Sequence, residues 1–166
     1  MILQKLLAPA QQERAIEKTD EIETHDDLLK VLVFHLDQER YGIPIENVIE
    51  IIRYTEATEV PHTVHFLEGI ISLHGEMIPV INGRKRLGHQ GQEPDKRTRI
   101  VILKEDNNRY GIIVDSTHQV VRLSRKNIEP TPPVVGMDAA FIQGVCEHHG
   151  QLIILLQLKR FLEFTS

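Results

Sequence analysis

The tetrapeptide Arg40-Tyr41-Gly42-Ile43 occurs a second time, as Arg109-Tyr110-Gly111-Ile112, 69 residues further along the chain. At the same offset, Ile51-Ile52 is matched by Val120-Val121. A second block repeats at an offset of 75. In it, Gly69-Ile70 matches Gly144-Val145, His74-Gly75 matches His149-Gly150, and the run 78–81 matches 153–156. Such self-similarity is typical of a duplicated structural unit, so we expect two similar subdomains.

Short apolar runs fill both copies and predict strands rather than helices. Val and Ile dominate these runs, and turn residues separate them at intervals of about ten, as in all-β domains. The runs are 31–36, 41–45, 48–52, 67–73, 77–81, 100–103, 110–114, 120–123, 141–146 and 152–156. Five strands per copy suit a small closed barrel, which leaves no exposed sheet edge. We therefore predict an all-β protein with two five-stranded barrels side by side.

The repeat also sets the expected domain boundaries. Residues 1–27 are mostly polar and carry three basic and seven acidic side chains, which predicts a flexible extension. We expect one domain over 28–166, with its first subdomain at about 28–88 and its second at about 97–156. Short helices are expected at the crossovers. A C-terminal helix over 156–164 is indicated by its apolar spacing and is assigned to the first subdomain.

Composition excludes several classes of protein. The net charge is -5, of which the body after residue 27 carries only -1, so nothing in the overall charge favours nucleic acid or an anionic membrane. The single cysteine rules out a disulfide framework and fits the cytoplasm. No apolar run approaches 18 residues, and no basic segment precedes the short N-terminal apolar piece, so we expect neither membrane insertion nor a secretory signal.

Residues that could support catalysis or bind a metal do not form a recognised pattern. The spaced pair His62 and His65 and the adjacent pair His148 and His149 lack the further convergent ligands that zinc requires. Cys146 lies inside an apolar strand, where a thiol behaves as a small hydrophobic side chain. No phosphate-binding loop, dinucleotide fingerprint or nucleophile elbow is present. We therefore predict no enzymatic activity, no cofactor and no metal.

One local feature favours an alternative. Between Asn82 and Arg99 there are six basic and two acidic side chains, including Arg84-Lys85-Arg86. Small barrels bind many ligands, so a nucleic-acid-binding or small-molecule-binding protein is the second hypothesis. Against it, the stretch contains no aromatic side chain that could stack on a base. A solvated loop is the simpler interpretation.

The stretch Leu67-Glu68-Gly69-Ile70-Ile71-Ser72-Leu73-His74-Gly75-Glu76-Met77-Ile78-Pro79-Val80-Ile81 resembles the signature of CheW-like domains. In that family a Gly, a hydrophobic pair and Asn-Leu-Arg-Gly lead into an apolar strand that ends Pro-Val-Ile-Asp-Leu-Arg. The first-hairpin sequence Tyr41-Gly42-Ile43 and the second-half sequence Gly111-Ile112-x-Val114-Asp115 also fit the family. The similarity covers about residues 30–163.

The resemblance implies a cytoplasmic adaptor without enzymatic activity, built from two intertwined SH3-like barrels. Such adaptors couple methyl-accepting chemoreceptors, at the cytoplasmic tip, to the regulatory domain of the histidine kinase CheA. We expect partner contacts at Val48, Glu50, Gly69, His74 and Val120, and for Glu50 and His74 the resemblance itself implies this role. A structural role remains open for three of them: Val48 and Val120 could belong to the barrel core, and Gly69 could satisfy only a backbone requirement.

This sequence departs from the family pattern at several positions. His74 replaces an Arg that serves partner binding together with a Glu at the Glu50 position, and Ser72 replaces an Asn. Asn82-Gly83-Arg84 replaces Asp-Leu-Arg, and Gln157 replaces a late Asp. Histidine is shorter than arginine and mostly neutral at pH 7, so we expect it to pair more weakly with Glu50. A CheW-like module of a non-flagellar chemosensory pathway is a further alternative.

Overall fold

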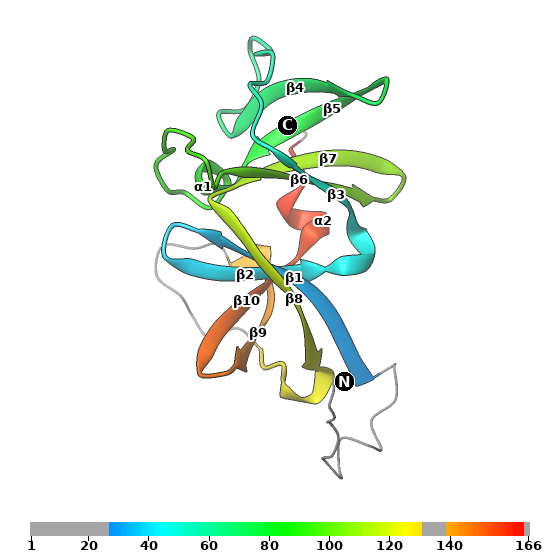
Figure 1. Cartoon of the computed structure of the whole chain (residues 1–166), viewed down its shortest axis with the longest axis vertical. Coiled ribbons are helices and arrows are strands. Elements are labelled where there is room, and N and C mark those ends of the chain that lie inside the picture. Colours follow the sequence, from blue (N-terminus) through cyan, green and yellow to red (C-terminus); the bar gives the residue numbers. More distant parts are fainter. Residues whose placement is uncertain (1–26, 131–138, 165–166) are drawn as a thin grey trace. The chain divides into compact units, whose positions relative to one another are not determined.

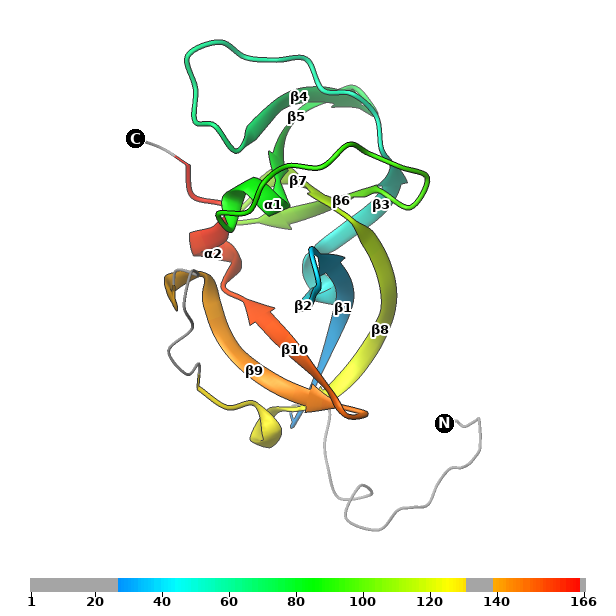
Figure 2. The same cartoon turned by 90° about the vertical axis from the view of Figure 1, so that its left-hand side faces the viewer.

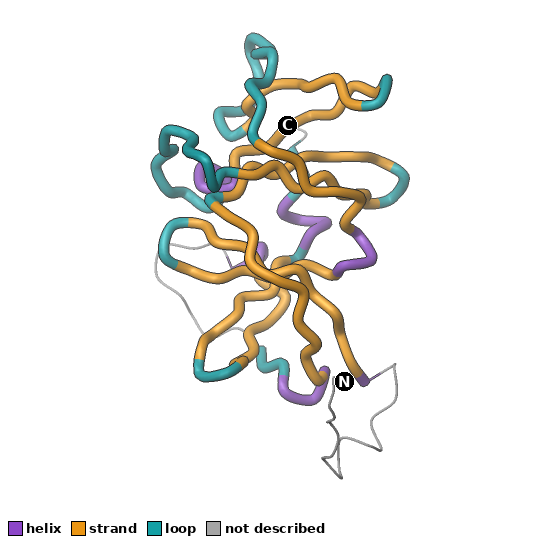
Figure 3. Tube along the Cα trace, in the orientation of Figure 1, coloured by secondary structure: helices purple, strands orange, loops and turns teal. Residues whose placement is uncertain are grey.

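The computed structural model describes residues 27–130 and 139–164. The predicted extension, residues 1–27, lies outside the described residues except for Asp27. The described residues fall into two compact units: a small one that includes 27–29 and Ser124–Lys126, and the main one, Lys30–Leu123 with 127–130 and 139–164. In the main unit, strands account for most of the described secondary structure (Figure 3).

The described residues contain ten strands, and each of the ten predicted runs overlaps one of them, so the all-β class is confirmed. The strands are β1 (Leu28–Leu36), β2 (Glu39–Pro44), β3 (Val48–Arg53), β4 (Leu67–Leu73), β5 (Glu76–Asn82), β6 (Arg99–Glu105), β7 (Asn108–Val114), β8 (Ser116–Ser124), β9 (Ile142–His148) and β10 (Gln151–Leu156). The short helices are η3 (Ile45–Asn47), α1 (Gly83–Arg86), η4 (Arg125–Asn127), η5 (Ala139–Phe141) and α2 (Leu158–Phe161). The predicted C-terminal helix is therefore present but short.

The strands form two five-stranded sheets that exchange hairpins between the two copies (Figures 1 and 2). One sheet, which we call sheet A, has the order β8-β1-β2-β10-β9; the other, sheet B, has the order β3-β6-β7-β5-β4. Each first hairpin, β1–β2 or β6–β7, thus joins three strands from the opposite copy. The sheets therefore divide the chain differently from the predicted subdomains 28–88 and 97–156, because the parallel pairs β2·β10 and β5·β7 connect the two copies.

An isolated backbone bridge links the segment after the third strand of each copy to its fourth strand. In sheet B, Thr58 pairs with Ile70; in sheet A, Glu129 pairs with Val145. In each case the two residues exchange both N–H···O hydrogen bonds, at 2.8–2.9 Å. Each bridge joins the segment beyond one terminal strand of a sheet to the other terminal strand, and so draws the sheet towards a closed barrel.

The first strand of each copy is buried on both faces. Val31–Phe34 in β1 and Ile100–Leu103 in β6 are buried continuously. In β6, Ile100 and Ile102 belong to a cluster confined to sheet B, whereas Val101 and Leu103 belong to a larger cluster that draws side chains from both sheets. This double burial explains why these runs are continuously apolar and do not alternate. The large cluster is the shared core of the main unit.

Arg86 holds the C-terminal helix α2 in place through contacts with residues of both copies. Its guanidinium lies 4.2 Å from the ring centre of Phe66 and 4.5 Å from that of Phe141, residues that occupy equivalent positions in the two copies. It also donates to the carbonyl oxygens of Phe161, Arg160 and Glu163 at 2.6–2.9 Å. A cation at the carbonyl end of a helix is favourable, so Arg86 caps α2 while it packs on both aromatic rings.

The sequence departures at the helix starts have different consequences. The Asn82 side chain accepts a hydrogen bond from the Lys85 backbone N–H at 3.1 Å, so it caps α1 as an Asp would. Gln157, at the corresponding position before α2, makes no side-chain capping bond.

Candidate partner-binding surfaces

Glu50 and His74 come together on sheet B, as the resemblance implied. The Nε2 atom of His74 lies 3.0 Å from Oε1 of Glu50, and the two side chains are 72% and 35% exposed. Glu50 lies in β3 and His74 follows β4, and these are the two terminal strands of the sheet. The contact is solvent-accessible, so it can rearrange at low cost when another group approaches.

The position of His74 is fixed by its turn. Leu73 pairs with Glu76, so His74 and Gly75 form a two-residue hairpin loop. Both have positive φ, 51° and 81°, as the type I′ turns of tight hairpins require. The copy His149-Gly150 has nearly the same values, 53° and 78°. The turn therefore holds the imidazole at the end of β4, within reach of β3.

Val48 is less exposed than its neighbour Ile49. It is half-buried and packs against the shared core, so its interpretation as a core residue fits better. The strand register shifts between Val48 and Glu50, and the exposed apolar side chains here are Ile49 and Ile51, at 41% and 40%. Sequence reasoning missed both, although Ile51 aligns with the predicted contact Val120 at the offset of 69. We call Ile49, Glu50, Ile51 and His74 the β3 surface.

Gly69 is required by the local backbone conformation. It is buried and has φ +147°, and a Cβ added there would lie 2.1 Å from the Thr58 carbonyl oxygen. Only glycine allows the 57–58 segment to approach this closely and form the bridge to Ile70. In the second copy, a Cβ on Gly144 would lie 2.9 Å from the Glu129 carbonyl oxygen, beside the equivalent bridge.

Val120 lies on sheet A, apart from the other predicted residues. It is 48% exposed in β8, a terminal strand, so its side chain is not part of the core. It lines a shallow groove of about 510 Å³ together with Lys30, Gln119, Val121, Arg122 and His148. We call these six residues the β8 surface. The predicted contact residues thus fall into two groups, one on each sheet.

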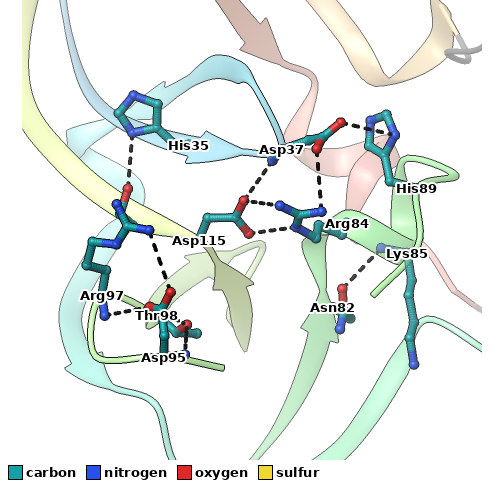
Figure 4. Close-up of polar contacts among 11 residues, drawn as sticks. His35, Asp37, Asn82, Arg84, Lys85, His89, Asp95, Arg97, Thr98 and Asp115 are labelled. Carbon is teal, nitrogen blue, oxygen red and sulfur yellow. Dashed lines mark hydrogen bonds and ion pairs between the residues drawn. The ribbon is translucent and has the colours of Figure 1, made fainter. Parts of the chain in front are cut away.

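A larger polar cleft, of about 720 Å³, surrounds an ion-pair network (Figure 4). Arg84 donates two hydrogen bonds to Asp115, at 2.9 and 2.6 Å, and lies 3.5 Å from Asp37. Asp115 also accepts the backbone N–H of Asp37 at 2.8 Å. The hydrogen bond to Asp115 and its negative charge hold the pKa of Arg84 above its usual value. The network ties the β1–β2 turn of sheet A to α1.

The basic cluster Arg84-Lys85-Arg86 is therefore engaged within the chain. Arg84 pairs with Asp115, Lys85 donates to Glu68 at 3.0 Å, and Arg86 binds carbonyl groups. The observation that motivated the nucleic-acid hypothesis is accounted for by these internal contacts.

Catalytic and metal chemistry find little support within residues 27–130 and 139–164. No group of three or more His, Cys, Asp or Glu side chains in these ranges could hold a metal ion. Cys146 is buried, and burial, with Glu129 and Glu147 nearby, raises the pKa of its thiol, which disfavours the nucleophilic thiolate. Among the same residues, no helix has the length and apolar character needed to cross a membrane.

The fold and these surfaces define a class of protein: two small barrels with exchanged hairpins, whose prominent exposed groups lie on terminal strands. Residues 30–165 match the family described as the CheW-like domain. The chain therefore belongs to the CheW-like domain family, and the resemblance noted in the sequence is confirmed.

Individual relatives agree with this assignment. The chemotaxis protein CheW of Thermotoga maritima is 30% identical over 145 residues, which cover 86% of this chain and 95% of that protein. The chemotaxis protein CheW of Bacillus subtilis is 30% identical over 149 residues, covering 89% and 94%. The crystal structure of the scaffolding protein TtCheW from Thermoanaerobacter tengcongensis matches with a TM-score of 0.77 and 37% identity, over 82% of this chain and 94% of that one.

Proposed function

We propose that this protein is a chemotaxis adaptor that couples chemoreceptors to a CheA-type histidine kinase in the cytoplasm and has no enzymatic activity of its own. Its relatives carry the names of chemotaxis and scaffolding proteins. An adaptor works by holding its partners in a fixed geometry, so that a rearrangement of one partner changes the populations of states of the other. The core shared by both sheets provides the rigid body that this requires.

The observation that carries the proposal is the β3 surface. Two exposed isoleucines flank the Glu50–His74 contact on a terminal strand. Exposed apolar side chains beside a polar pair that includes a carboxylate are the usual composition of a transient protein interface, in which the apolar groups give affinity and the polar groups give specificity. We propose that the regulatory domain of the kinase, itself CheW-like, contacts this surface.

The remaining predicted residues take different parts in this proposal. Val48 and Gly69 act indirectly, by shaping β3 and by drawing β4 towards the 57–58 segment. Val120 provides a second contact on sheet A. The chemoreceptor tip would use a surface separate from the β3 surface, so that the adaptor can hold kinase and receptor together.

Binding of a purified CheA regulatory domain, measured by calorimetry, tests the β3 surface. We expect Glu50→Arg or Ile51→Glu to weaken binding by about tenfold, because a reversed or buried charge in a contact costs at least about 1.4 kcal/mol. Glu46→Arg is the matched control, since Glu46 is exposed in the adjacent η3 and its replacement changes the net charge equally. If Glu50→Arg and Glu46→Arg bind the kinase domain as tightly as the unmodified protein, the proposed surface is wrong.

A further inference from the structure

The β8 surface differs in charge from its counterpart on sheet B. Lys30 and Arg122 are exposed on it, and among the described residues that line the groove there is no carboxylate. Neither cation has an ion-pair partner within the part of the chain that the structure describes. In the other copy, the position of Gln119 is occupied by Glu50, and the position of Lys30 by Arg99. Arg99 is already engaged, because it donates to the carbonyl oxygens of Lys96 and Thr98.

One of the lining residues, His148, has basic neighbours of its own. Burial and then His149 and Arg40 lower the pKa of His148, which is one of the lining residues. Basic neighbours thus contribute, after burial, to the lowered pKa of His148, and the exposed Lys30 and Arg122 give the groove a positive charge that favours anions.

The shape of the site restricts what can occupy it. The groove runs beside a terminal strand, and Val120 lies among its basic residues with 48% of its surface exposed. A terminal strand offers backbone N–H and C=O groups to a further extended segment. Side chains of an extended segment alternate, so an apolar residue can cover Val120 while its neighbours reach the surrounding cations.

We propose that the β8 surface binds an extended acidic segment of a partner protein, with its carboxylates on Lys30 and Arg122 and an apolar side chain on Val120. This inference rests on the proposed function and deepens it by assigning a partner chemistry to the contact at Val120. The β3 surface, which carries Glu50 in place of Gln119, does not share this preference.

The probe is a capped ten-residue peptide of alternating Glu and Val that carries a fluorophore. We measure its fluorescence anisotropy as the full chain is added. We expect saturable binding that weakens as salt is raised, and no binding of the matching Lys-Val peptide. Arg122→Glu should weaken peptide binding about fivefold to tenfold, because one attraction becomes a repulsion. Arg122→Lys keeps the positive charge and should retain most of the affinity. Arg53→Glu is the matched control, because Arg53 is the exposed equivalent of Arg122 on sheet B.

Amide chemical shifts locate the peptide. Changes concentrated on β8 and around Lys30 support the proposal, whereas changes elsewhere, equal effects of Arg122→Glu and Arg53→Glu, or absence of binding overturn it. If Arg122→Glu fails to fold by circular dichroism, Lys30→Glu replaces it under the same criteria. The CheA regulatory domain is titrated into the same samples. If the unmodified chain binds the kinase domain but not the peptide, this inference is wrong; if it binds the peptide but not the kinase domain, the proposed function is wrong.

Discussion

Replacing Gly69 by alanine tests whether this residue acts through the backbone or as a contact. The new Cβ would lie 2.1 Å from the Thr58 carbonyl oxygen and 2.6 Å from its carbon, too close for the backbone to remain in place. Alanine is also strained at φ +147°, which costs about 1–3 kcal/mol. If the bridge to Ile70 opens, its two 2.9 Å hydrogen bonds are lost as well, at roughly 1 kcal/mol each. We expect Gly69→Ala to lower the free energy of unfolding by about 3–5 kcal/mol.

The matched control is Gly75→Ala. Gly75 also has positive φ, +81°, but a Cβ there meets no atom within 4 Å. Its replacement should therefore cost only the backbone strain of about 1–2 kcal/mol.

Urea unfolding followed by far-ultraviolet circular dichroism is a suitable assay, because the chain contains no tryptophan. With a slope of about 2 kcal/mol per molar urea, Gly69→Ala should lower the midpoint by about 2 M and Gly75→Ala by about 0.5–1 M. Equal midpoints for the two variants would refute the close-approach argument. A stable Gly69→Ala protein that no longer bound the kinase domain would instead identify Gly69 as a contact residue.

Four further outcomes are expected from individual side chains. Arg84→Ala should destabilise the protein by about 1–3 kcal/mol in urea unfolding, because it leaves the half-buried Asp115 without its bidentate partner. Tyr41→Phe should be neutral or slightly stabilising in the same assay, since the Tyr41 hydroxyl is buried without a hydrogen-bond partner among the described residues. Burial and neighbouring basic side chains lower the pKa of His148, so the unfolded chain binds a proton at this residue more readily than the folded chain does. The free energy of unfolding in urea should therefore decrease as the pH is lowered through about 6.5, and should decrease less in His148→Asn. The Cys146 thiol should react with a thiol reagent only when urea unfolds the chain.

The strands could be predicted from the sequence because their signals are local. Runs such as Val31–Leu36 and Ile100–Leu103 are short, β-branched and separated by turn residues, and each lies in a strand. The repeat gave further support: α1 and α2, the turns at His74 and His149, and the bridges at Thr58 and Glu129 all recur between the copies. The family assignment rested on the same local motifs.

The candidate surfaces were predicted less completely. Glu50 and His74 do meet, but the exposed Ile49 and Ile51 were not distinguished from core residues, and the half-buried Val48 was expected to be a contact. Exposure alternates along β3, with Ile49 and Ile51 more exposed than Val48 and Ile52. Which face of β3 is covered depends on how it pairs and packs with β6, some fifty residues away, and the local pattern does not show it because four of residues 48–52 are apolar.

The sequence by itself determined that the chain is all-β, that it contains two copies of one strand unit, and to which family it belongs. The tertiary structure alone decided how the copies share their strands, because the sheets exchange hairpins through the parallel pairs β2·β10 and β5·β7. It also decided that Arg86 caps α2 between two equivalent phenylalanines and does not serve as a solvent-exposed cation. The physical reason is that hydrophobic periodicity records which residues are buried, whereas strand partners and ion pairs depend on contacts between residues that are distant in sequence.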